Sequence, residues 1–258
     1  MKDNLLEIKH LLDEKYLQFN NTSFIETDPI SIPHQFSKKE DIEVSAFLLA
    51  TIAWGNRQSI IKNGNKLMAL MNQEPHDFIL NFSKKDEARF SQFVHRTFNS
   101  KDCIFFLKSL KNIYLHHKGL EGAFTNNFSK NDESIKTAIV QFRELFLSIN
   151  HLQRVEKHLS NPNSNSSAKR LSMYLRWMVR KDNHGVDFGI WNKIHSSQLC
   201  LPLDVHTGNV SRKLGLLSRK QNDWKSVEEI TNVLKSFDSN DPIKYDFSLF
   251  GLGAFEGF

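Results

Sequence analysis

The sequence predicts an all-α protein. Apolar residues recur at helical spacing through almost the whole chain, no segment alternates as a β-strand does, and residues that start or stop helices stand at the ends of these patterns. With 258 residues and 40% hydrophobic content, the chain is long enough for one large domain or for two lobes around a core. It contains no internal repeat.

The first predicted helix begins at a capping box, residues 37–40, and runs through Trp54, where Gly55 ends it. This helix is apolar on most sides, as a buried central helix is. Apolar residues at helical spacing predict further helices over residues 60–71, 102–117 and 134–149. These segments form the helical bundle of the first lobe that we expect.

The second half of the chain continues the helical pattern after one polar turn, residues 161–167. A helix is predicted over residues 169–180, and Asp223 is expected to cap another that ends at Phe237. Asp241 and Pro242 open a last helix, because proline is favoured at the first helical position. We expect one lobe over residues 41–182 and a second lobe from residues 1–40 with 183–258.

Composition and charge limit the class of protein. The two cysteines, Cys103 and Cys200, cannot by themselves form a disulfide framework, a zinc site or an iron–sulfur cluster. The longest apolar run, residues 44–54, is far shorter than the roughly 20 residues that cross a bilayer, and the first ten residues lack a signal-peptide core. The sequence therefore predicts a cytoplasmic protein with no membrane contact and no cofactor, and its net charge of +5 favours a polyanionic partner.

The segment KRLSMYLRWMVR, residues 169–180, has one apolar and one basic face on a helical wheel. The basic face carries Lys169, Ser172, Arg176 and Arg180. Such a face on a surface helix is ordinarily only solvated. However, Lys169 stands in the first turn, where the helix dipole disfavours a cation, and Arg170 adjoins it. Both effects favour the uncharged amine, which is the nucleophilic form of lysine.

Asp204 stands between an apolar stretch and a helical pattern in LCLPLDVHTGNVSRKLGLL, residues 199–217. Aspartate is a preferred N-cap, and Val210, Leu214 and Leu217 supply an apolar helix face behind it. A carboxylate can also stabilise positive charge that develops during a reaction. The residues alone leave both roles open.

The turn, the helix that begins with lysine and the stretch Pro202-Leu203-Asp204-Val205-His206 together resemble the helix-hairpin-helix DNA glycosylases, most closely their 8-oxoguanine branches. The likeness extends over residues 41–258 and is sharpest over residues 166–217. It implies a two-lobed helical fold with a variant helix-hairpin-helix and no iron–sulfur cluster. It also implies that Lys169 is the attacking amine and that Asp204 steadies the developing sugar cation and helps to manage protons. The chain is similar, too, to a bacterial family of uncharacterised proteins.

The resemblance implies which residues contact DNA. Residues after the early buried helix would approach the opened duplex, the turn would hold a phosphate, and the basic helix face would follow the backbone. The expected DNA-binding residues are Asn56, Arg57, Gln58, Ser166, Ser167, Arg170, Arg176, Arg180 and His206.

The sequence departs from the family at three points. Its turn has no glycine, so serine and asparagine side chains would replace bare backbone in holding phosphate. The 35 positions from Lys169 to Asp204 are nearer to the gap of the archaeal-type branch than to that of the human type. The four-cysteine cluster that some relatives carry is absent.

A damaged base inside a duplex must be flipped into a pocket and stacked there. Segment 181–198 links the two reacting residues, and we expect its Phe188 or Trp191 to stack on an oxidised purine. Its Asp187 or a nearby backbone group is expected to read the purine edge. Alternatively, the two aromatics are buried anchors and Asp187 is a helix cap. Trp54, in the early helix, is expected in the core.

The sequence thus predicts a base-excision repair glycosylase with AP lyase activity, a monomer that acts on double-stranded DNA at the nucleoid of a bacterial cytoplasm. The expected lesion is an oxidised purine, 8-oxoguanine above all. A non-catalytic nucleic-acid-binding protein is the alternative; it would use the basic face but would not need Lys169 and Asp204 together. A metal-dependent hydrolase built on Asp204, His206, His116 and His117 is disfavoured, because adjacent histidines on a helix point about 100° apart. No metal ligand is assigned.

Overall fold

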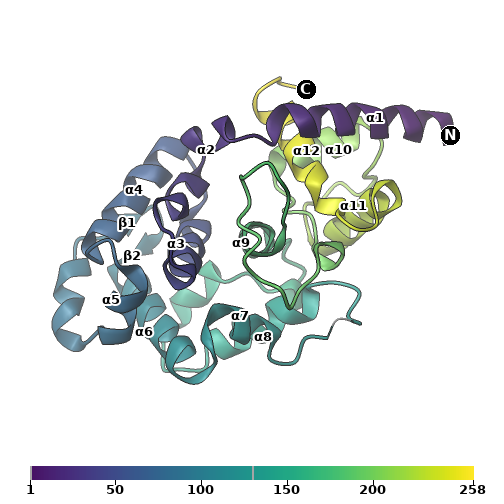
Figure 1. Ribbon diagram of the computed structural model, residues 1–258. Helices are drawn as coiled ribbons and strands as arrows, with labels where there is room; N and C mark the ends of the chain where they lie inside the picture. Colours follow the sequence, from purple (N-terminus) through teal and green to yellow (C-terminus); the bar gives the residue numbers. More distant parts are fainter. Residues whose placement is uncertain (1, 130) are drawn as a thin grey trace. The chain divides into compact units, whose positions relative to one another are not determined.

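The computed structural model describes residues 2–129 and 131–258, and helices dominate both ranges (Figure 1). Strand is limited, among these residues, to the short antiparallel pair β1 (Val94–His95) and β2 (Phe98–Asn99). The predicted all-α fold class is confirmed. The chain divides into two compact units: unit 1 comprises Met1–Phe24, Lys130–Lys136 and Asn161–Phe258, and unit 2 comprises Ile25–Ser129 and Thr137–Ser160.

These boundaries differ from the predicted lobes of residues 41–182 and 1–40 with 183–258. The turn and the helix that begins at Lys169 belong to the same unit as Asp204, because that helix shares its ion pairs with the C-terminal segments. Both residues assigned to chemistry therefore lie in unit 1.

Unit 2 is arranged around the buried helix α3, which runs from Lys39 to Ile52. Phe47 of α3 lies in a cluster of rings with Phe106, Phe142 and Phe146, whose centroids are 5.3–6.0 Å from its own. The other helices of this unit are α4 (Arg57–Leu70), α5 (Pro75–Asn81), α6 (Ser100–His116), α7 (Gly119–Thr125) and α8 (Lys136–Phe146), of which the first residue counts with unit 1. Short 3-10 turns stand at Pro29–Ser31, Pro33–Gln35, Lys84–Phe90 and Gln153–His158, and α2 (Ser23–Thr27) leads in from unit 1.

The predicted capping box at residues 37–40 is wrong in detail. The N-cap of α3 is Lys38, and no side chain caps the helix there. The predicted central helix nevertheless forms, and α4, α6 and α8 fall on the segments predicted as helical. The helices α5 and α7 and the β1–β2 hairpin are additional to the prediction, because each is too short to give a recognisable hydrophobic period.

Unit 1 contains α1 (Lys2–Phe19), α9 (Lys169–Val179), α10 (Val205–Lys213), α11 (Trp224–Phe237) and α12 (Tyr245–Ala254). Three short 3-10 turns join them, at Pro162–Ser164, Ser196–Gln198 and Pro242–Lys244. As predicted, Asp223 caps α11 by accepting a hydrogen bond from Ser226 N.

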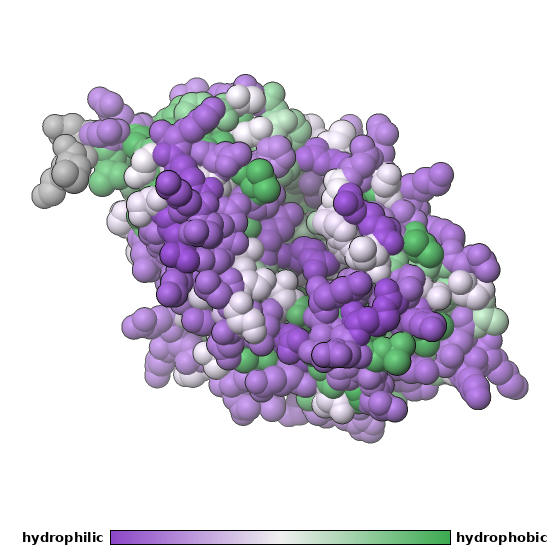
Figure 2. All heavy atoms as spheres, turned by 180° about the vertical axis from the view of Figure 1, so that it is seen from behind, coloured by the Kyte–Doolittle hydropathy of each residue, from purple (hydrophilic) through white to green (hydrophobic). Residues whose placement is uncertain are grey.

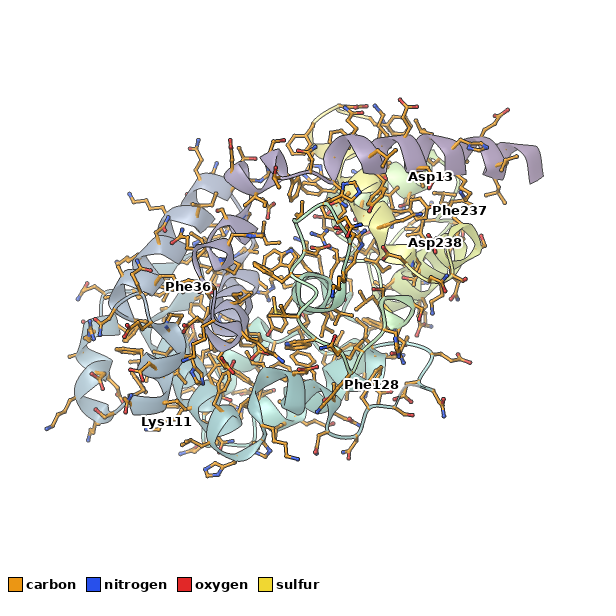
Figure 3. The ribbon with its side chains drawn as sticks, viewed as in Figure 1. Asp13, Phe36, Lys111, Phe128, Phe237 and Asp238 are labelled. Atoms are coloured by element: carbon orange, nitrogen blue, oxygen red, sulfur yellow. The ribbon has the colours of Figure 1, made fainter. Side chains whose placement is uncertain are left out.

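Helix α12 packs against α1 and α10 (Figure 1). Two glycines permit this close approach: a Cβ at Gly251 would stand 2.1 Å from the Phe19 ring, and one at Gly253 would stand 3.1 Å from Cβ of His206. The start of α12 is fixed by polar contacts, in which Tyr245 donates to Asp13 and Lys244 donates to Asp238. Asp13 and Asp238 lie close together on this side of unit 1 (Figure 3).

The face of the molecule drawn in Figure 2 is mainly polar. Figure 2 presents one face, on which hydrophilic side chains predominate and apolar ones form small separate patches. Within residues 2–129 and 131–258, no helix combines the length and apolar character needed to span a membrane.

Candidate active site

The turn before α9 is built without glycine. Asn161 accepts a hydrogen bond from Asn163 N and begins the turn, and Asn165 takes the left-handed conformation that closes it (φ 60°). Asn165 also donates to Asp223 Oδ2 (3.0 Å), which braces the turn against the start of α11. Asparagine supplies the positive φ that glycine usually provides, so the turn closes without a glycine.

Lys169 is the first residue of α9. The N-cap before it, Ala168, is left-handed (φ 48°) and provides no side-chain cap. Lys169 is therefore held at the positive end of the helix dipole, as the sequence predicted. Its side chain is 27% exposed, so the amine remains accessible.

Asp204 is the N-cap of α10. Its Oδ1 accepts hydrogen bonds from His206 N (2.9 Å) and Thr207 N (3.0 Å), and its own N–H donates to Thr207 Oγ1 (2.9 Å). The other oxygen, Oδ2, lies 3.8 Å from Lys169 Nζ. The two roles left open by the sequence are compatible, because one carboxylate oxygen caps the helix while the other faces the amine.

This pair brings an amine and a carboxylate together at the N-termini of two helices. The Asp204 side chain is 22% exposed, so both groups can meet a large substrate at the surface. The 34 intervening residues do not separate them, because segment 180–203 leaves α9 and returns to its start within unit 1. An amine 3.8 Å from a carboxylate can form an imine at a carbon whose positive charge the carboxylate stabilises.

The interpretation of Arg176 and Arg180 as exposed DNA-binding residues is wrong. Arg176 is 5% exposed and Arg180 is fully buried, and Ser172 on the same face is also buried. Acidic side chains from other segments pair with both arginines: Arg176 donates to Asp187 and Asp246, and Arg180 donates to Asp187 and Asp241. A helical wheel identifies a charged face but not what covers it, and here buried ion pairs cover it.

Two of the three base-pocket residues are structural. Asp187 accepts hydrogen bonds from Arg176 Nε (3.2 Å) and Arg180 Nη1 (3.1 Å), so its oxygens are engaged. Trp191 is 2% exposed and packs edge-on against Tyr174. Trp191 is therefore a buried anchor, and the prediction that it stacks on an oxidised purine is wrong. Phe188 is half-buried, with its main-chain N–H bonded to Trp177 O.

The remaining unit 1 candidates lie near the Lys169 end of α9 or the start of α10. Ser166 and Ser167 are half-buried in the turn, and Ser166 Oγ accepts a hydrogen bond from Ala168 N. Arg170 is half-buried, and burial lowers its pKa to about 10, which still leaves it charged at neutral pH. His206 is exposed on the first turn of α10, with its ring 6.1 Å from that of Phe250.

Three candidates belong to unit 2. Asn56 is exposed and caps α4 by accepting a hydrogen bond from Ser59 N, and Arg57 and Gln58 form the first turn of that helix. Trp54 is half-buried between the rings of His95 and His158, so it is only partly the core residue that was expected.

Sequence reasoning missed Asp246, on the first turn of α12. It is 5% exposed, and Arg176 Nη1 donates to its Oδ2 (2.5 Å). Burial raises the pKa of Asp246 to about 6; the positive charge of Arg176 opposes this rise, and the negative charge of Asp204 adds to it. One signal was available, because Asp246 is the one acid in the apolar segment YDFSLFGLGAF, residues 245–255.

Sequence reasoning also missed Asn222. Its Nδ2 donates to the main-chain oxygen of Asp204 (2.9 Å), and Arg212 Nη2 donates to its Oδ1 (2.7 Å). Asn222 thereby holds the backbone of the cap residue, while the neighbouring Asp223 braces the turn before Lys169. No pattern in the sequence marks this contact, because it joins residues 18 positions apart.

No group of three or more His, Cys, Asp or Glu side chains in the described ranges is arranged to hold a metal ion. In comparisons with known proteins, residues 28–255 match the model of a family described as "Protein of unknown function (DUF2400)". No curated protein and no solved structure matches the chain.

Proposed function

The chain belongs to the DUF2400 family, whose description names no activity, and we propose from its site that it is a DNA glycosylase with AP lyase activity. The observation that carries this proposal is the pair formed by Lys169 and Asp204, 3.8 Å apart and both partly exposed at helix N-termini. The resemblance to the helix-hairpin-helix glycosylases supports the same assignment.

In this proposal the uncharged amine of Lys169 attacks C1′ of the damaged nucleotide, and the C1′–N bond to the base breaks. Asp204 keeps its negative charge and stabilises the positive charge that develops on the sugar. Two main-chain N–H groups hold its Oδ1, so Oδ2 stays directed at the reacting carbon. The imine that results permits β-elimination of the 3′ phosphate, which cuts the strand.

The proposed substrate is double-stranded DNA with an oxidised purine, 8-oxoguanine above all, and the protein acts on it as a monomer at the nucleoid in the cytoplasm. The net charge of +5 suits a polyanion. Phe188 is the aromatic of segment 181–198 that remains for stacking on the flipped base, since Trp191 is buried.

Reductive trapping tests this function. The protein is incubated with a duplex that contains 8-oxoguanine or an abasic site, borohydride is added, and the covalent protein–DNA adduct is measured on a denaturing gel. We expect an adduct with the parent protein and none with Lys169→Gln. Lys225→Gln, which changes an exposed lysine on α11, is the matched control and should trap as the parent does.

The outcomes separate the two function classes. Strong binding to lesion DNA with no adduct and no excision would favour the non-catalytic binding protein. An undiminished adduct with Lys169→Gln would overturn the assignment of the nucleophile.

A further inference from the structure

Asp246 lies on the face of α12 that meets the site. Asp246, Phe250 and Gly253 are spaced i, i+4 and i+7, so they share one face of this helix. Phe250 and Gly253 both contact His206 on the first turn of α10, directly after Asp204. Asp246 itself is bonded to Arg176, two turns along α9 from Lys169. The Asp246 carboxyl group is therefore bonded to α9 and belongs to the face of α12 that packs against α10.

We propose that Asp246 is the acid–base group of this site, which takes a proton from the Lys169 nitrogen during imine formation and returns it to the sugar. This inference rests on the proposed glycosylase function and extends it. Arg176 binds Oδ2, whereas Oδ1 accepts no hydrogen bond from any residue that the structure describes, so Oδ1 is left to exchange the proton through water or substrate.

The two carboxyl groups have different environments, which suits different roles. Asp204 is partly exposed and held by two main-chain N–H groups, which suits a carboxylate that stabilises positive charge on the sugar. Asp246 is buried, and burial raises its pKa to about 6, close to the pH at which a proton carrier is efficient.

The charges that act on Asp246 come from α9 and from the start of α10. Arg176 and Lys169 of α9 favour its ionised form, and Asp204 of α10 opposes it. Helix α1 meets α12 with the Phe19 ring at Gly251 and the Leu12 carbonyl at Ser248. The polar groups of α1 nearest this end are engaged elsewhere: Asp13 accepts from Tyr245, and Tyr16 accepts from Arg180.

Each proton that moves in this step has a donor and an acceptor. After Nζ of Lys169 bonds to C1′ and the base departs with the bonding electrons, the nitrogen carries a positive charge and gives one proton to the Asp246 carboxylate. The nitrogen lone pair then forms the C1′–N double bond, and the C1′–O4′ bond breaks. O4′ takes the proton from Asp246, which returns to its ionised form.

The pH dependence of trapping on a preformed abasic site tests this role, because that substrate needs no base departure. We expect the slope of log rate against pH to steepen by one unit below about pH 6 in the parent, as Asp246 becomes protonated. In Asp246→Asn this break should vanish and the rate at pH 7.5 should fall by about 100-fold. Asp246→Glu keeps an acid–base group and should retain a break, which also makes the test valid if the Asn variant folds poorly.

The matched control is Asp187→Asn. It removes the other carboxylate bonded to Arg176 and so perturbs the same arginine, yet it should keep the break near pH 6. If Asp246 acted only through the electrostatic effect of its negative charge, removing that charge would favour the uncharged amine of Lys169. Asp246→Asn would then form the trapped adduct at the parent rate or faster. That result, or a break that persists in Asp246→Asn, would overturn the inference and leave the proposed function standing. A parent protein that gives no adduct at any pH would overturn both.

Discussion

Asp204 combines a structural and a proposed chemical role in one side chain. Its Oδ1 satisfies two N–H groups at the start of α10, and its Oδ2 faces Lys169 at 3.8 Å. The sequence could identify the residue but not this division of labour, since the direction of Oδ2 depends on where α9 lies. A change that keeps the cap and removes the charge therefore separates the two roles.

We predict that Asp204→Asn binds lesion DNA nearly as the parent does and melts at a similar temperature, but loses base excision, because the amide oxygen still caps α10. Asp204→Ala should lower the free energy of unfolding by about 0.5–2 kcal/mol, since it removes the cap as well. Thermal melts and excision assays run in parallel measure both effects. Normal excision by Asp204→Asn would reduce Asp204 to a helix cap.

The raised pKa of Asp246 also predicts how the stability of the folded protein depends on pH, which can be measured without DNA. Its pKa is about 6 in the folded chain and 3.8 in the unfolded chain, so the folded state binds more protons between these values. The contribution of Asp246 to the free energy of unfolding is fully present below about pH 4. It is lost as the pH rises through about 6, at no more than about 1.4 kcal/mol per pH unit. Denaturant unfolding of the parent and of Asp246→Asn is measured from pH 4 to 7. The free energy of unfolding of the parent minus that of the variant should fall as the pH rises through this window. Parallel curves would show that Asp246 does not titrate there.

At the scale of the element, α9 depends on what covers its charged face. The sequence correctly predicted the helix, its start at Lys169 and its two faces. It did not reveal that Asp187, Asp241 and Asp246 cover the basic face, because these acids come from other segments and a helical wheel describes one segment alone. The same contacts explain why segment 181–198 is an anchored connection.

Arg180 should accordingly be essential to stability. Arg180→Ala would leave Asp187 and Asp241 without their shared buried cation, and we predict a loss of about 3–5 kcal/mol in the free energy of unfolding. The next residue, Lys181, is exposed, and Lys181→Ala should change stability by less than about 0.5 kcal/mol. If both variants lost an equally small amount of unfolding free energy in urea, this would contradict the buried network of ion pairs. It would favour a surface helix whose charges are only solvated.

At the scale of the whole molecule, apolar periodicity and caps were enough to predict the all-α class and the positions of α4, α6, α8 and α11. The division into units was not predictable, because it depends on ion pairs and ring contacts between segments far apart in the chain. The site was half predictable: Lys169 and Asp204 are marked by their motifs, whereas Asp246 and Asn222 reach it only through tertiary packing.

The central claim is that Lys169 is the nucleophile of a DNA glycosylase, and mass spectrometry of the borohydride-trapped adduct tests it most directly. After digestion of the protein and the DNA, the peptide that carries the sugar remnant is sequenced by fragmentation. We expect the remnant on Lys169 and on no other lysine when the duplex contains the lesion, and no remnant with an undamaged duplex. A remnant on a different amine, or no covalent adduct with any lesion or abasic duplex, would contradict the account.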